Sequence, residues 1–311
     1  MLTLPRATRH APPTALVAAA VSFLLAACGG GDAGSGAAGA SGDLVITGFS
    51  TPESVLHDPT SDVYLVSNIN GAPLDKDGNG FISRVSPDGE VLDLHWIDGA
   101  ADGVTLNAPK GMAIQDGTLY VADIDCLRLF DSETGAHKDD ICLEHATFLN
   151  DVAPGGNGTV FFTDMGMKAG PEDLEPAGSD AVYRLIDDDR VVAVKKDAAM
   201  GGPNGIAVGS LGIMVVTMGS GEVFRLTADG DRTNVMPKSQ RQLDGIEMLP
   251  DGGFLMSSWG DRCVYRIGGD GKVSKVVTDV DGPADIGYDA TRNRVLVPLF
   301  NGNEVRVHPL G

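Results

Sequence analysis

Six polar residues stand near the starts of short apolar segments that are spaced along the whole chain. In chain order they are Glu53, Lys110, Asn150, Asn204, Asp244 and Asp285. Carboxylate and amide oxygens suit a hard cation, and Ca²⁺ accepts about six to eight of them in loose geometry. Carboxylates that face one another away from water repel, and a cation between them removes this repulsion. These residue types predict a divalent-cation site, with Ca²⁺ as the expected ion, provided that the fold brings them together.

The segments that carry these residues belong to a sequence repeat. One unit begins at 202–208 and continues with apolar strands at 211–217 and 222–226, an Asp-Gly turn and a further strand. Asp-Gly pairs supply the positive φ that tight hairpins need, and they lie at 88–89, 229–230 and 270–271. Units start near 110, 150, 204, 244 and 284. Four short strands in about forty residues are typical of a β-propeller blade.

Six such units fit the chain, so the sequence predicts an all-β, six-bladed β-propeller over residues 43–311. The last unit ends at Gly311 after three strands, and a lone apolar strand at about 44–49 precedes the first unit. We expect this strand to complete the last blade and close the ring, because joining the two chain ends removes open sheet edges. The innermost strands then meet around a central channel, where the six polar residues would converge.

Two units are longer than the others, with the excess at 70–80 and at 166–180. Both insertions fall between the second and third strands, on the face where the innermost strands begin. We expect them to overhang the channel mouth, since loops on a rigid scaffold often carry function. The alternative is that the two insertions have no functional role. The run from Asp75 to Gly80 matches the first half of an EF-hand loop, but its closing position is Ser86. It is therefore either a second Ca²⁺ loop or a turn.

The first 42 residues are predicted to lie outside the propeller. A positive start precedes the apolar run 14–27, which is too short to span a bilayer. Leu25-Ala26-Ala27-Cys28 resembles a bacterial lipobox, so residues 1–27 read as a lipoprotein signal peptide and Cys28 as the lipidation site. The alternative is an ordinary signal peptide that is cut nearby. Residues 28–42 read as a flexible Gly/Ala/Ser tether. Either way we expect an exported protein that faces the periplasm or cell surface.

Charge and cysteine placement limit the partners and the compartment. The formal net charge of −20 makes nucleic acid and anionic membrane surfaces poor partners, so any membrane contact would come through the lipid anchor alone. Cys126 and Cys142 flank the turn 133–135 symmetrically and could face each other on paired strands. An exported compartment permits a disulfide there; otherwise both are small core residues.

We expect a monomer with a small-molecule substrate.

Three motifs resemble the senescence marker protein/gluconolactonase family of six-bladed propellers, which includes luciferin-regenerating members. They are Pro203-Asn204-Gly205-Ile206-Ala207, Leu149-Asn150-Asp151 and Leu243-Asp244-Gly245-Ile246. The resemblance implies that Glu53, Asn204 and Asp244 hold one divalent cation. It also implies that Asn150 contacts substrate beside the metal and that Asp244 is the general base. The family usually has Glu-Gly-Pro in blade one, whereas this chain has Glu53-Ser54-Val55, so the expected ligand is kept and the residues beside it differ.

The function implied by this resemblance is metal-assisted hydrolysis of a lactone or related ester. Lys110, Asp151 and Asp285 are further candidates for substrate contact, although Lys110 and Asp285 could instead pair inside the channel. The sequence lacks a Gly-x-Ser-x-Gly elbow, a phosphate-binding Gly loop and zinc spacing among its His residues, which disfavours serine hydrolases, nucleotide enzymes and zinc enzymes. The alternative is a non-enzymatic, NHL-like binding propeller with a structural metal.

Overall fold

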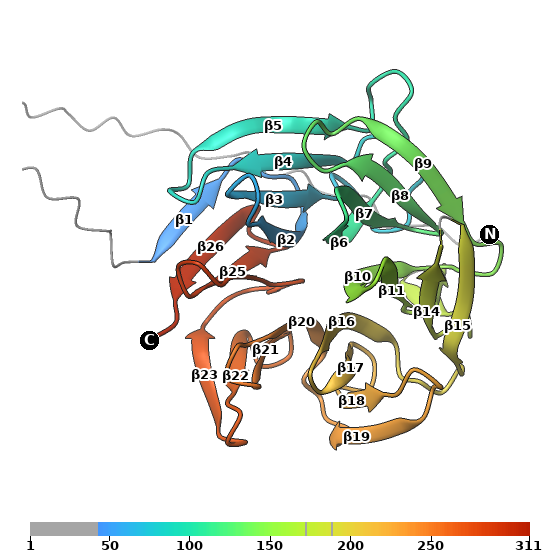
Figure 1. The fold of residues 1–311 in the computed structure, drawn as a ribbon, viewed down its shortest axis with the longest axis vertical. Coiled ribbons are helices and arrows are strands. Elements are labelled where there is room, and N and C mark those ends of the chain that lie inside the picture. The colour runs from blue at the N-terminus through green and yellow to red at the C-terminus, as the bar shows by residue number, and fades with distance from the viewer. Residues whose placement is uncertain (1–42, 172, 188) are drawn as a thin grey trace, which may run out of the picture. The chain divides into compact units, whose positions relative to one another are not determined.

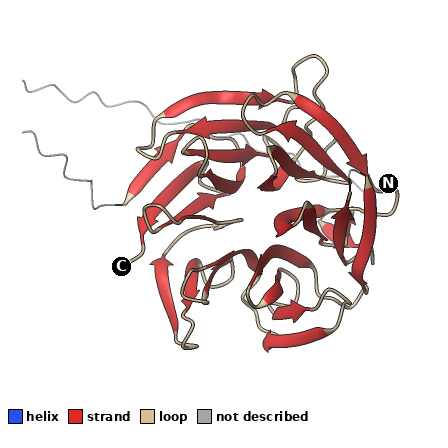
Figure 2. Ribbon diagram, in the orientation of Figure 1, coloured by secondary structure: helices blue, strands red, loops and turns tan. Residues whose placement is uncertain are grey.

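The structure, a computed structural model, describes residues 43–171, 173–187 and 189–311. Every regular element in these residues is a β-strand (Figure 2). The predicted signal peptide, tether and lipidation site at Cys28 lie outside the described residues, so export and membrane attachment stay predictions. Within the described part of the chain, no helix is long and apolar enough to cross a membrane.

Six four-stranded antiparallel sheets are arranged as the blades of a β-propeller ring, which confirms the predicted fold (Figure 1). From the channel outward, blade 1 contains β2 (Pro52–Asp58), β3 (Val63–Asn68), β4 (Phe81–Val85) and β5 (Val91–Asp98). Blade 2 contains β6 (Pro109–Gln115), β7 (Thr118–Asp123), β8 (Cys126–Asp131) and β9 (His137–Cys142). Blade 3 contains β10 (Leu149–Gly156), β11 (Thr159–Asp164), β14 (Ala181–Ile186) and β15 (Arg190–Lys196).

The remaining blades follow the same order of strands. Blade 4 contains β16 (Pro203–Gly209), β17 (Gly212–Thr217), β18 (Val223–Leu226) and β19 (Arg232–Met236). Blade 5 contains β20 (Leu243–Met248), β21 (Phe254–Ser258), β22 (Cys263–Ile267) and β23 (Val273–Thr278). Blade 6 contains β24 (Gly287–Asp289), β25 (Arg294–Leu299), β26 (Glu304–Pro309) and β1 (Leu44–Thr47). The insertion in blade 3 forms a separate hairpin of β12 (Met167–Ala169) and β13 (Leu174–Pro176).

The ring closes by pairing the two ends of the propeller. Strand β1 runs antiparallel to β26, with Leu44 opposite Val307 and Thr47 opposite Glu304. The blue first strand and the red last strands therefore lie side by side in Figure 1. This pairing confirms the predicted closure by the N-terminal strand, and it gives blade 6 the same four strands as the other blades while it joins the two ends of the propeller.

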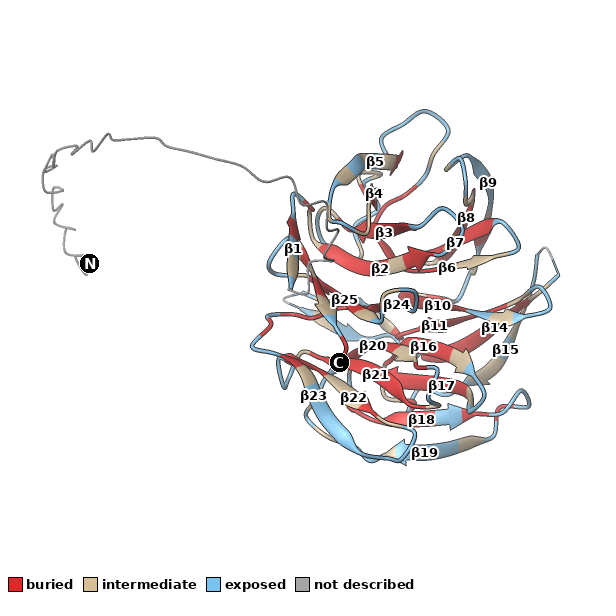
Figure 3. Ribbon diagram, turned by 60° about the vertical axis from the view of Figure 1, so that its left-hand side comes forward, coloured by how far each residue is buried: buried red, intermediate tan, exposed pale blue. Residues whose placement is uncertain are grey.

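Burial falls from the second strand of each blade to the outermost strand (Figure 3). Every residue of β3 is buried, whereas β19 has no buried residue. A second strand is covered by a neighbouring blade on each face, so it is apolar almost throughout rather than alternating. The core consists of layers between adjacent blades: in one of them, Phe161 and Val182 of blade 3 pack with Ile206 and Val215 of blade 4.

Candidate active site

The predicted site residues occupy β-bulges at the starts of the innermost strands. In β16, Pro203 pairs with Thr217 and the next pair is Ile206 with Val215, so Asn204 and Gly205 oppose one residue. The same shift in register occurs around Lys110, Asn150 and Asp244, and a shorter one occurs around Glu53. A bulge takes its residues out of the regular ladder and redirects their side chains. Repetition of this irregularity in successive blades aims polar side chains at one central space.

A Gly follows the polar bulge residue in blades 2, 4 and 5 because the neighbouring blade comes very close. A Cβ on Gly205 would lie 2.3 Å from the carbonyl oxygen of Asp244, and one on Gly245 would lie 2.4 Å from the backbone nitrogen of Ile286. Substitution at either position would push adjacent blades apart. The Asn-Gly and Asp-Gly motifs thus combine a polar side chain that faces the channel with the closest contact between blades.

A cavity of about 740 Å³ lies at this end of the channel, a size that suits a small-molecule ligand. Five of the six polar residues named from the sequence line it: Glu53, Lys110, Asn150, Asn204 and Asp244. Both insertions reach it, through Pro73 from blade 1 and through Ala169 and Leu174 from the β12–β13 hairpin. The cavity therefore has a polar floor from the bulges and a rim built partly from the two long loops.

Four oxygen atoms on the floor are buried and have no hydrogen-bond partner within the protein. They are Glu53 Oε2, Asn150 Oδ1, Asn204 Oδ1 and Asp244 Oδ1. A buried polar atom without a partner costs about 1–3 kcal/mol, so four in one cavity require an explanation. Hard oxygen donors of this kind fit a divalent cation. Among the described residues no group of three or more His, Cys, Asp or Glu side chains could hold a metal, so an ion here would depend on the amide oxygens.

Burial shifts the pKa of the charged groups around this cavity. Desolvation raises the pKa of Glu53 well above its usual value, and repulsion from Asp244 and Asp285 adds to the effect. Desolvation also raises the pKa of Asp244, followed in size by repulsion from Asp285. Removal from water lowers the pKa of Lys110 to about 8, against the attraction of Glu53. Because burial and mutual repulsion disfavour the ionised forms of Glu53 and Asp244, a further positive charge in this cavity would stabilise these carboxylates.

Trp259 orients Asp244, and Phe148 together with the Ala108 carbonyl orients Lys110. The sequence analysis did not identify these partners. The indole Nε1 of Trp259 donates a 2.7 Å hydrogen bond to Asp244 Oδ2, which leaves Oδ1 free to face the cavity. Lys110 Nζ donates to the carbonyl oxygen of Ala108 at 2.8 Å and lies 4.8 Å from the ring centroid of Phe148. Lys110 is thus held against the wall by one hydrogen bond and one cation–π contact.

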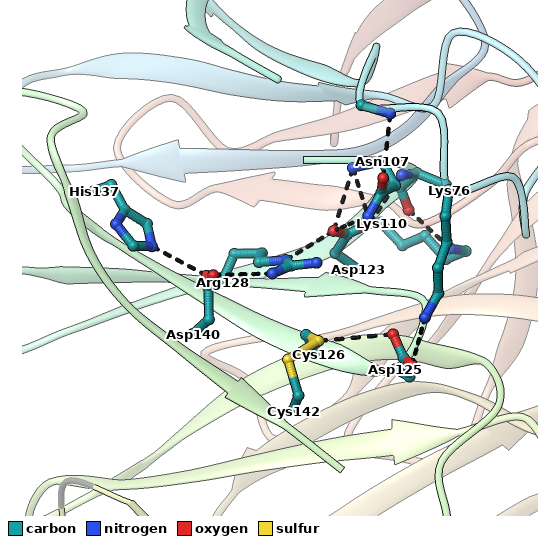
Figure 4. Close-up of polar contacts among 12 residues, drawn as sticks. Lys76, Asn107, Lys110, Asp123, Asp125, Cys126, Arg128, His137, Asp140 and Cys142 are labelled. Atoms are coloured by element: carbon teal, nitrogen blue, oxygen red, sulfur yellow. Dashed lines mark hydrogen bonds and ion pairs between the residues drawn. A yellow bond between two sulfur atoms is a disulfide. The ribbon is translucent and has the colours of Figure 1, made fainter. Parts of the chain in front are cut away.

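Acidic residues at the ends of second strands support the bulges from behind. Asp123 accepts hydrogen bonds from the backbone nitrogens of Asn107 and Ala108 and from Arg128 Nε (Figure 4). Asp164 likewise accepts from the backbone nitrogen of Phe148 at 3.0 Å. These carboxylates anchor the segments that lead into β6 and β10. Their recurrence at the last position of β7 and β11 is the signal in the sequence that could have identified them.

Asp151 and Asp285 do not belong to this cavity and instead line a second one of about 450 Å³. Asp151 accepts hydrogen bonds from the backbone nitrogens of Val152 and Ile206, so it ties blade 3 to blade 4. Asp285 accepts a hydrogen bond from Ser54 Oγ at 2.6 Å, so it ties blade 6 to blade 1. Each carboxylate is thus bonded to the next blade and does not line the larger cavity, and its contact with substrate stays a prediction.

Cys126 and Cys142 are directly opposite on β8 and β9 and form a disulfide with an S–S distance of 2.02 Å (Figure 4). Cys263 is free and buried. The Asp75–Gly80 loop is held by local contacts, such as that from Asn79 Nδ2 to Asp77 Oδ2, and by an ion pair from Lys76 to Asp125. A second Ca²⁺ site in this loop stays a prediction.

Several proteins of known structure have a fold similar to that of this chain. None of the curated proteins matches the chain in sequence. A gluconolactonase from Xanthomonas campestris has a similar structure, with 18% identity and a TM-score of 0.65 over 86% of this chain and 89% of its own. A putative gluconolactonase is 18% identical, with a TM-score of 0.63 over 86% of this chain and 92% of its own. Virginiamycin B lyase from Staphylococcus aureus is 12% identical, with a TM-score of 0.60 over 87% of this chain and all of its own.

At these identities the structural likeness shows the fold alone. The sequence match is more specific, because residues 79–285 fit the family described as the SMP-30/Gluconolactonase/LRE-like region. This segment contains the bulges at Lys110, Asn150, Asn204 and Asp244, and it covers well over half of the chain. The chain belongs to the SMP-30/gluconolactonase/LRE-like family.

Proposed function

We propose that the protein hydrolyses a lactone or a related ester, with a divalent cation held in the central cavity by Glu53, Asn204 and Asp244. The observation that carries this proposal is the set of four buried, unpartnered oxygens on the cavity floor. Membership of a family that includes gluconolactonases supports the same class of activity. Ca²⁺ is the expected ion because the donors are all oxygens in loose array.

The role of the cation would be electrostatic. When bound, it would polarise the lactone carbonyl and offset the negative charge that develops on its oxygen. Glu53 and Asn204 would hold it from blades 1 and 4 without entering the reaction. Asn150 lies beside them with a free Oδ1, so its amide would orient the substrate.

Asp244 is the proposed general base. Its carboxylate would take a proton from a water molecule as the water oxygen bonds to the carbonyl carbon. The ring C–O bond then breaks, and the proton passes to the departing alkoxide oxygen, which yields a hydroxy acid. Trp259 holds the other carboxylate oxygen at 2.7 Å, so the base keeps one orientation throughout.

The test is a panel of small lactones and phosphotriesters, assayed with and without a chelator, on wild type and on Asp244→Ala. We expect lactone turnover that chelation abolishes and Ca²⁺ restores. In Asp244→Ala we expect a loss of about 10²–10³-fold or more, the usual cost of one such electrostatic contact. The control is Asp229→Ala, which removes an exposed carboxylate from an Asp-Gly turn in blade 4.

Near-wild-type lactone turnover by Asp244→Ala would refute the assignment of the base. Turnover that persists after complete metal removal would refute the role of the cation. A protein that Ca²⁺ stabilises but that turns over no member of the panel would instead be a binding propeller with a structural metal.

A further inference from the structure

The residue that directly follows the second strand is apolar in every blade. These residues are Ile69, Ile124, Met165, Met218, Trp259 and Phe300. All of them except Ile124 line the central cavity, and Ile124 packs beneath the rim with Ile69 and Phe300. Because second strands end at equivalent positions in each blade, the six positions form a ring around the channel, and five of the six side chains line the cavity. We call this set the apolar ring.

Other apolar groups extend the apolar ring into a continuous wall. Phe148 lies over Lys110 at the foot of the wall, and Leu174 projects from the β12–β13 hairpin. The rings of Trp259 and Phe300 are 5.4 Å apart between centroids, so the two aromatic residues form one surface. The cavity therefore has two parts, a polar floor built from bulge residues and an apolar wall above it.

The wall offers few hydrogen-bonding groups to a ligand. Apart from the floor residues, the polar side chains that line the cavity are Asp173 and Gln242, and both are exposed at the rim. The indole N–H of Trp259 is already bonded to Asp244. A lactone with a hydroxyl on each ring carbon would press several hydroxyls against apolar surface without partners, which is unfavourable. An alkyl or aryl group in the same place would gain from burial.

We infer that the substrate is a lactone with an apolar substituent, whose carbonyl meets the polar floor while its alkyl or aryl group lies against the apolar ring. This inference rests on the proposed lactonase function for the reaction, but the selection of apolar ligands depends on the wall alone. It assigns specificity to Met218, Phe300 and their equivalents. A polyhydroxylated sugar lactone is then a poor substrate.

The first experiment compares δ-decalactone, δ-valerolactone and D-glucono-δ-lactone on the purified full-length chain with Ca²⁺. The first two share one ring and one carbonyl and differ by a pentyl group. Since even one methylene in an apolar pocket is worth about tenfold or more in discrimination, we expect kcat/KM for δ-decalactone to exceed that for δ-valerolactone at least tenfold. Gluconolactone should be the poorest of the three, and a preference for it would overturn the inference.

The second experiment separates this inference from the proposed reaction. Calorimetry measures binding of the two corresponding lactams, 6-pentyl-2-piperidone and 2-piperidone, which resist hydrolysis. We expect the pentyl lactam to bind at least tenfold more tightly, even if no lactone is turned over, in which case only the proposed function fails. Equal affinities would overturn the inference, even if lactones are hydrolysed.

Variants locate the preference on the apolar ring. Met218→Gln keeps the length of the side chain but adds an amide, so the affinity ratio of the two lactams should fall severalfold. Leu211→Gln is the matched control in the same blade, because Leu211 is exposed at the β16–β17 turn. A ratio that is unchanged in Met218→Gln, or that falls equally in Leu211→Gln, would contradict the assignment.

Discussion

The hydrogen bond from Trp259 to Asp244 provides the sharpest test of the proposed mechanism. Trp259→Phe keeps an aromatic ring in the cavity wall but removes the indole N–H that lies 2.7 Å from Asp244 Oδ2. The carboxylate of Asp244 then loses its hydrogen bond to the indole and can rotate more freely within the cavity floor. If Asp244 is the general base, a loss of orientation should lower kcat with little effect on KM.

The size of the effect follows from the bond. A hydrogen bond to a charged group contributes about 1.5–3 kcal/mol, and about 1.4 kcal/mol is tenfold in rate. We therefore expect kcat to fall about 10- to 100-fold. The bond also lowers the pKa of Asp244 against the opposing effect of burial, so its removal should raise that pKa. Because the base must be ionised, the rising limb of the pH–rate profile should move to higher pH.

The assay is lactone hydrolysis followed with a pH indicator or by direct titration, across the pH range and at saturating Ca²⁺. Trp96→Phe is the matched control, because the chain has two Trp residues and Trp96 lies on the outer strand β5 against Arg84. A thermal melt on each variant separates folding from catalysis. A Trp259→Phe protein with wild-type kcat and an unshifted pH profile would show that Asp244 does not act through this geometry.

Two further predictions concern stability. Cys142→Ser breaks a disulfide that spans 16 residues, worth about 3 kcal/mol in the chain-entropy account, so the melting temperature should drop by several degrees. A reductant should lower the melting temperature of wild type to that of the variant and leave the variant unchanged; equal melting temperatures without reductant would contradict this. Burial, then repulsion from Asp285, raises the pKa of Glu247 from 4.5 to about 8. Since its folded pKa lies above the unfolded one, its contribution to stability is full below about pH 4.5 and is lost as pH rises through about 8. Glu247→Gln should therefore show a smaller decline in melting temperature than wild type over this interval, and parallel curves for the two proteins would refute the assignment.

Much of the fold could be predicted because its signals are local. Repeated apolar strands and Asp-Gly turns mark the blades, and a spare strand at the N-terminus implies the pairing of β1 with β26. Polar residues at repeat starts also identified five of the groups that line the cavity, including Glu53 and Asp244. The repeat placed each of them at an equivalent position, and ring closure supplied the shared axis.

The direction of each polar side chain could not be predicted in the same way. Asn150 and Asp151 are neighbours on one bulge, yet Asn150 lines the central cavity and Asp151 is bonded to the backbone of blade 4. Asp285 is bonded to Ser54, which lies 231 residues away along the chain. Such partners come from adjacent blades, so no window of sequence contains both members of the pair.

By itself, the sequence determined the number of blades, the order of strands and the residues that could donate oxygen to a cation, because all of these depend on local periodicity and turn chemistry. Only the tertiary structure decided which of those oxygens remain free. Asp151 and Asp285 are satisfied by neighbouring blades, whereas Glu53, Asn204 and Asp244 each keep an unpartnered buried oxygen. The physical reason is that a hydrogen bond depends on the position of both partners, and here the second partner belongs to another blade.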